Sequence, residues 1–129
     1  MRIVLDTEQD YTPEWEGNRE ESEPVVFRLR YLTTAERQRF SGLKAAASLI
    51  SMGANGSSSV SPNVEIDFEG MFKAGVVGIS GLNVRRRGKD TDDAITTPAA
   101  FLELPSFDGL FWEVVLEIQR ANARQDPGN

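Results

Sequence analysis

The sequence of 129 residues contains no histidine and no cysteine. Without cysteine there can be no disulfide and no thiolate metal site, and without histidine there can be no imidazole–zinc site. The Ser-His-Asp and Cys-His arrangements of nucleophilic enzymes are excluded for the same reason. Catalysis would have to depend on carboxylates, on lysine or on a metal held by oxygen. We therefore expect no enzyme activity, no cofactor and no metal site.

Long apolar runs are absent as well. No segment has the roughly 18 consecutive apolar residues of a membrane-spanning helix. The first residues, MRIVLDTEQD, also lack the apolar run of a signal peptide. We expect an intracellular protein with no membrane partner.

Positive charge is too scarce to predict a nucleic-acid partner. The formal net charge is −6, and the segment Asp6–Glu23 alone has eight acidic residues and one arginine, which gives −7. The rest of the chain therefore sums to +1, whereas general nucleic-acid affinity needs clustered Lys and Arg. Arg85–Lys89 includes four basic residues that could hold an anion, but the acids of Asp90–Asp93 cancel most of their field. We expect this stretch to be a neutralised, charged turn.

Two groups of carboxylates could form a catalytic or metal site. Asp90, Asp92 and Asp93 begin like a calcium loop, but the positions that need an oxygen ligand, Gly and Glu hold apolar residues. Glu113 and Glu117 stand one helical turn apart, which is a spacing that a paired-carboxylate site uses. Their apolar neighbours favour a solvated helix face instead. An enzyme built on either group is the weakest functional alternative.

The N-terminal part predicts two short β-strands joined by a loop. Arg2–Leu5 is a short apolar run and predicts an edge strand, and Val25–Leu32 alternates between apolar residues and arginine. Residues 6–23 predict an acidic loop whose charges pair with those arginines. Tyr11 and Trp15 either pin this loop to the body of the protein, which we favour, or await a partner.

The first predicted helix follows the second strand directly. Thr33 and Glu36 have the capping-box spacing, in which a hydroxyl and a carboxylate each accept from the other residue's backbone N–H. This predicts a helix over residues 34–50. Residues 52–63 are rich in Gly and Ser and predict a flexible connection.

The second half predicts further helices. Thr97 as a cap with Pro98 at the first helical position predicts a short helix. Residues 75–84 fit either a helix or a strand, and the sequence leaves this choice open. The remaining helices are expected over residues 64–79, 98–104 and 106–124. The predicted fold class is therefore α+β and predominantly α-helical, with short N-terminal β-strands followed by three to four helices in a single domain over residues 1–129.

The last helix carries the functional prediction, because it is apolar on two sides. Ser106 can cap it, and a core stripe at helical spacing runs along one side. This stripe consists of Phe107, Leu110, Phe111, Val114, Val115, Ile118 and Ala121. Trp112 and Leu116 lie on the other side, so the helix is either buried all round or has a second partner. We assign partner binding to Trp112, Leu116, Gln119 and Arg120.

The order of the motifs resembles a known family. FRLRYLTTAERQRF is followed by GVVGISGLNV, then by a charged turn, ITTPAAFLELPSF and the final helix LFWEVVLEIQRAN. Over about residues 24–123 the chain resembles the small tail assembly chaperones of long-tailed bacteriophages and prophages. The resemblance implies a mostly helical protein without catalytic residues in the cytoplasm of the bacterial host cell. It implies binding of the tape-measure protein, with the tail tube protein and a second copy of the chain as further candidate partners.

A structural role in the phage particle is the main alternative. The acidic segment and the Ser-rich connection are longer than the family pattern needs, which leaves room for a different tail or head–tail adaptor component. Such a component would stay in the virion, whereas the chaperones leave it. The sequence does not decide between these two roles.

Overall fold

The computed structural model describes residues 1–41 and 66–124 of the chain. The predicted Gly/Ser-rich connection and the predicted C-terminal part of the first helix lie outside the described residues. Within them the elements follow in this order: β1 Glu8–Tyr11, the 3-10 helix η1 Trp15–Glu20, β2 Val26–Arg30, α1 Thr34–Ser41, α3 Phe68–Gly75, β3 Val76–Ser80, β4 Asn83–Val84, β5 Asp93–Ala94, α4 Pro98–Leu102 and α5 Asp108–Arg124.

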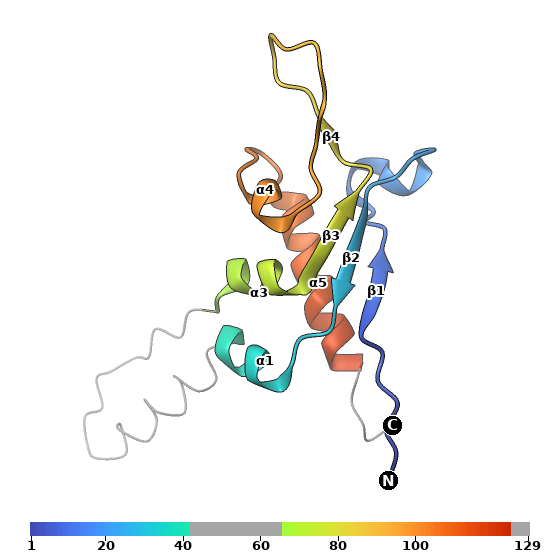
Figure 1. The fold of residues 1–129 in the computed structure, drawn as a ribbon, viewed down its shortest axis with the longest axis vertical. Helices are drawn as coiled ribbons and strands as arrows, with labels where there is room; N and C mark the ends of the chain where they lie inside the picture. The colour runs from blue at the N-terminus through green and yellow to red at the C-terminus, as the bar shows by residue number, and fades with distance from the viewer. Residues whose placement is uncertain (42–65, 125–129) are drawn as a thin grey trace, which may run out of the picture.

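An antiparallel sheet in the order β1-β2-β3 stands at the centre of the fold (Figure 1). The predicted alternation of β2 is confirmed, since Phe27 and Leu29 are buried and Arg28 is exposed. On the exposed face the Arg28 guanidinium pairs with Glu8 at 3.2 Å and with Asp10 at 2.9 Å. The expected pairing between this strand and the acidic segment is therefore confirmed for Arg28.

The helices cover the other face of this sheet. α3, α4 and α5 contact the strands, and α1 packs against α3 (Figure 1). The Phe27 ring of β2 lies 6.3 Å from the Phe72 ring of α3 and 5.8 Å from the Phe101 ring of α4. Burial of such aromatic side chains is the main source of stability in a core of this size. One hydrophobic core thus joins the sheet to its helices.

The caps predicted at Thr33 and Thr97 are confirmed, whereas the predicted cap at Ser106 is wrong, because α5 begins only at Asp108. The Thr33 N–H donates to Glu36 Oε1 at 3.0 Å, and the Glu36 N–H donates to Thr33 Oγ1 at 3.2 Å. Thr97 Oγ1 accepts from the Ala100 N–H at 3.2 Å, with Pro98 in the first helical turn. Both helix starts are stabilised by local contacts, because each of these hydrogen bonds joins residues three positions apart.

The prediction of a predominantly helical fold with strands only at the N-terminus is wrong. In the described residues, five strands in two sheets are interleaved with the helices. The predicted helix over residues 64–79 ends at Gly75, and Val76–Ser80 continues as β3. β-Branched Val76, Val77 and Ile79 suit a strand, and pairing with β2 supplies the hydrogen bonds that a helix would have made internally. The open choice for residues 75–84 is thus resolved largely as strand.

The predicted edge strand at Arg2–Leu5 is also wrong. These residues are exposed and in no strand, while β1 forms at Glu8–Tyr11 inside the segment predicted as a loop. The rest of that segment is held by buried Asn18, whose amide donates to the carbonyls of Pro13 and Val25 at 2.9 Å. The acidic segment is therefore part of the folded body.

Smaller differences concern helix ends and the charged turn. α5 begins at Asp108, two residues later than predicted, because Ser106 adopts a left-handed φ of 67° in the preceding turn. The charged turn joins β4 to β5 in a hairpin that projects from the body (Figure 1). Arg85 pairs there with Asp92 at 2.8 Å, which agrees with the expected charge neutralisation.

Candidate partner-binding surface

The outer face of α5 carries the four residues predicted to bind a partner. Trp112 and Leu116 are 45% and 54% exposed, and Gln119 and Arg120 are exposed as well. Their spacing places all four on one side of the helix. Five residues of the predicted core stripe, Leu110, Val114, Val115, Ile118 and Ala121, are buried on the opposite side. The other two, Phe107 and Phe111, are only partly buried. The division of α5 into a core face and an exposed apolar face is therefore confirmed, while partner binding stays a prediction.

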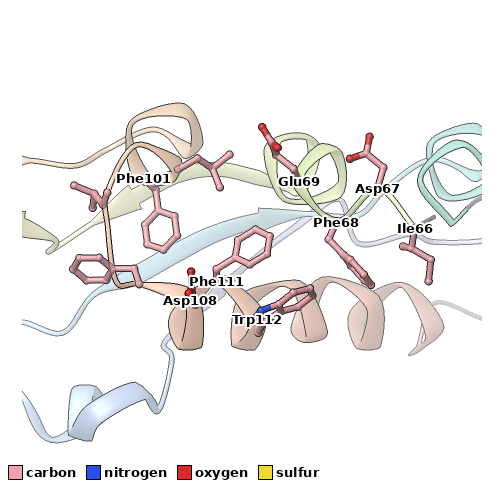
Figure 2. A pocket seen from close by; sticks show the side chains of 11 residues that line it. Ile66, Asp67, Phe68, Glu69, Phe101, Asp108, Phe111 and Trp112 are labelled. Carbon is pink, nitrogen blue, oxygen red and sulfur yellow. The ribbon is translucent and has the colours of Figure 1, made fainter.

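Trp112 also forms one wall of a hollow between α3, α4 and α5 (Figure 2). The hollow measures about 530 Å³. Its apolar lining consists of Ile66, Phe68, Phe101, Leu102, Leu104, Phe107, Phe111 and Trp112. We call this hollow the aromatic groove. It extends the exposed apolar face of α5 toward the start of α3.

Edge-to-face ring contacts hold Trp112 in place. Its ring lies 4.8 Å from that of Phe68 and 5.2 Å from that of Phe111. The Phe111 ring is in turn 5.1 Å from that of Phe72 in the core. Such pairs contribute about 0.5–1.5 kcal/mol beyond the burial of their area. Trp112 is therefore a half-exposed but well-supported side chain.

The close approach of α3 to α5 sets the shape of the groove. A Cβ atom on Gly75 would lie 2.7 Å from Cδ1 of Ile118, so any larger residue here would require the Ile118 side chain to move. Asp67 starts α3 by accepting from the Gly70 N–H at 2.8 Å.

Three carboxylates flank the aromatic groove. Asp67 and Glu69 come from the start of α3, and Asp108 from the start of α5 (Figure 2). No lysine or arginine is among the described residues that line the groove. Lys73, one turn after Glu69, pairs with it at 3.1 Å on the exposed side of α3. The groove therefore combines an aromatic interior with negative charge.

Glu113 and Glu117 were predicted to form a solvated face, and this is wrong. Glu117 is only 7% exposed, and its carboxylate accepts from Gln9 of β1 at 3.5 Å. Glu113 accepts from the Tyr11 hydroxyl at 2.6 Å and from the Glu14 N–H at 2.7 Å. The acidic segment covers this side of α5, so both carboxylates have structural roles there.

The aromatic residues of the acidic segment pin it to the body, as we favoured. Tyr11 binds Glu113, and the Trp15 ring lies 5.4 Å from that of Phe107. Burial, followed by the hydrogen bond to Glu113, raises the pKa of the Tyr11 phenol. Neither aromatic residue therefore awaits a partner in this structure.

Other features bear on alternative functions. Among the described residues, no group of three or more acidic side chains is arranged to hold a metal ion. No helix in the described parts of the chain combines the length and apolar character needed to cross a membrane. Arg30, the other arginine of β2, is engaged by Glu36 rather than by the acidic segment.

Comparison with known proteins does not assign a family. No family model, curated protein or solved structure matches this chain.

The structure adds several groove residues that the sequence did not assign to binding. Phe68 and Ile66, which is 40% exposed, come from the start of α3 and the residues just before it. Phe101 and Phe107 reach the same hollow from the segment between β5 and α5. The available signal was the density of aromatic residues around Pro105. It did not show that α3 would meet this segment.

Proposed function

We propose that this protein is a non-enzymatic chaperone that binds an apolar helical segment of another protein. We further propose that the partner is the tape-measure protein of a long-tailed phage, bound during tail assembly in the cytoplasm of the bacterial host cell. The nature of the partner follows from the motif resemblance, and the binding surface follows from α5. The observation that carries the proposal is the exposed apolar face of α5 and its continuation into the aromatic groove.

The spacing of this face suits a helical partner. Trp112 and Leu116 are four residues apart, so their side chains are neighbours on the helix surface. An amphipathic helix can place apolar anchors against such a surface and into an adjoining groove. Half-exposed tryptophan is enriched among the residues that dominate binding energy at interfaces. A soluble protein gains little from exposing these side chains unless a partner covers them.

The polar end of this face fits the same role. Gln119 and Arg120 extend the exposed face of α5 to about two helical turns beyond Trp112. Arg120 is exposed and lies 3.5 Å from the buried Glu117, so its guanidinium stands at the surface within reach of a partner. These two residues would form the polar rim that surrounds the apolar anchors of an interface.

The test is a binding measurement with overlapping segments of the tape-measure protein from the same genome. We expect Trp112→Ala combined with Leu116→Ala to weaken binding by roughly 2 kcal/mol or more, about 30-fold. Val77→Ala is the control, because it removes another half-exposed apolar side chain, on β3. The control should bind like the unaltered protein.

Thermal melting separates a lost interface from a lost fold. Because Trp112 contacts Phe68 and Phe111, Leu116→Ala alone is the milder variant, and its melt should stay close to that of the unaltered protein. Equal binding by all variants would contradict the proposed surface. Stoichiometric presence of the protein in purified phage particles would instead support the structural tail or head–tail adaptor role.

A further inference from the structure

The chemistry of the aromatic groove indicates the kind of side chains that enter it. Phe68, Phe111 and Trp112 offer ring faces and edges to a large apolar side chain. Ring faces also attract Lys and Arg side chains that pass over them. A partner segment with a large apolar side chain next to a Lys or Arg could therefore pack against the rings and also interact with the carboxylates beside them.

The flanking carboxylates stand on two sides of these rings. Figure 2 shows Asp67 and Glu69 on the α3 side, above Phe68, and Asp108 at the start of α5, beside Phe111. Asp67 uses one oxygen to cap α3. Glu69 and Lys73 are both more than half exposed, so their ion pair is a weak surface interaction that a partner's cation can replace.

The net negative charge of the whole chain also favours a cationic partner segment. The formal net charge of −6 raises the local concentration of cationic segments near the surface and speeds their association. An acidic segment entering the groove would face Asp67, Glu69 and Asp108 with no lining basic residue among the described residues to compensate. The groove thus discriminates by repulsion as well as by attraction.

We propose that the aromatic groove takes the basic end of a partner helix, with a large apolar side chain between the rings and a Lys or Arg within one turn of it. The carboxylates on the two sides of the groove contact that cation and exclude acidic segments. This inference rests on the proposed function, since Trp112 belongs to both the groove and the exposed face of α5. It adds the charge of the bound segment.

Three synthetic helical peptides test the inference. They share one apolar face, with Leu and Phe four residues apart, and differ only in two flanking residues that are Lys, Gln or Glu. We expect the Lys peptide to bind about tenfold more tightly than the Gln peptide, and the Glu peptide to bind most weakly. The difference should shrink between about 50 mM and 500 mM salt, because exposed charges are screened.

Charge-removing variants locate the effect. Glu69→Gln with Asp108→Asn should abolish the preference for Lys and keep the binding of the Gln peptide. Glu20→Gln with Glu21→Gln removes the same charge from exposed positions at the end of η1, and this control should keep the preference. Thermal melts of both variants show whether the fold is retained.

The outcomes separate this inference from the proposed function. Equal binding of all three peptides, lost in Trp112→Ala, overturns the charge selection and leaves the chaperone role standing. Binding of tape-measure segments without binding of any of the three peptides also overturns the groove assignment alone. Self-association that Trp112→Ala abolishes and that blocks the Lys peptide would show that a second copy occupies the groove, and would overturn this inference.

Discussion

The Tyr11 hydroxyl donates a 2.6 Å hydrogen bond to Glu113, although the two residues are 102 positions apart. The same carboxylate oxygen accepts from the Glu14 N–H at 2.7 Å. Through these two bonds a carboxylate on α5 holds the acidic N-terminal segment, whose own strand β1 completes the sheet. One side of α5 is thereby covered, and the face with Trp112 and Leu116 is left exposed.

Removing the Tyr11 hydroxyl should destabilise the protein moderately. We expect Tyr11→Phe to lower the free energy of unfolding by about 1 kcal/mol, because Glu113 keeps only the bond from Glu14. Tyr31→Phe is the matched control, since the Tyr31 hydroxyl reaches Gln9 only at 3.4 Å and should contribute less. Urea denaturation measures both changes. Equal losses in the two variants would contradict the role given to Tyr11.

The crossing of α3 and α5 predicts a paired effect at Gly75 and Ile118. A Cβ at position 75 would lie 2.7 Å from Ile118 Cδ1, so Gly75→Ala should cost about 1–3 kcal/mol through overpacking. Ile118→Val removes that methyl group and should relieve part of this cost. We expect the double variant to be more stable than the sum of the single changes predicts. Strict additivity in denaturation experiments would argue against the contact.

Two leucines of α5 allow the same substitution to be compared on its two faces. Leu110 is 1% exposed, so Leu110→Ala should lower the free energy of unfolding by about 2–5 kcal/mol. Leu116→Ala, at 54% exposure, should change it by about 0.5 kcal/mol or less. Chemical denaturation of the two variants measures the difference. A large loss for Leu116→Ala would mean that this face is covered in solution, and would remove it as a free binding surface.

The pair formed by Arg30 and Glu36 predicts a dependence of stability on pH. The hydrogen bond from Arg30, together with those from Thr33, lowers the pKa of Glu36 to about 2 from an ordinary 4.5. A lowered folded-state pKa stabilises the protein above the unfolded value, and this contribution is lost as the pH falls from about 4.5 to 2. We expect a loss of about 1–3 kcal/mol over this range.

Glu36→Gln isolates this contribution from that of the other carboxylates. The variant should be less stable near neutral pH and should lose less stability on acidification than the unaltered protein. Urea denaturation at about pH 6 and pH 3 gives the comparison. The same acid sensitivity in both proteins would show that Glu36 is not the group responsible.

Sequence patterns predicted those features that depend on neighbours a few residues away. The Thr33–Glu36 capping box and the Thr97–Pro98 start were confirmed because their hydrogen bonds close within one turn. The buried face of α5 followed from its helical spacing for the same local reason. The exposed face of α5 was found in the same way. The sequence therefore identified this part of the candidate surface but not the aromatic groove.

Strand positions could not be predicted in this way because pairing is not local. β1 contains Glu8, Gln9 and Asp10, which have little preference for strands, but Arg28 of β2 pairs with both acidic residues across the sheet. Residues 76–80 fit helical spacing by sequence, but pairing with β2 makes them a strand. Residues 76–79 were thus predicted as helix and residues 8–11 as loop, although both segments are strands.

The residues of this chain determined by themselves that histidine and cysteine chemistry is absent, where several helices begin and which side of α5 is apolar. Only the tertiary structure decided that Glu117 is buried, that the acidic segment is folded onto α5 and that five aromatic rings meet beside three carboxylates. These latter features arise between segments far apart in the sequence. Their energies depend on distances and burial that exist only once the core around Phe27 and Phe72 has formed.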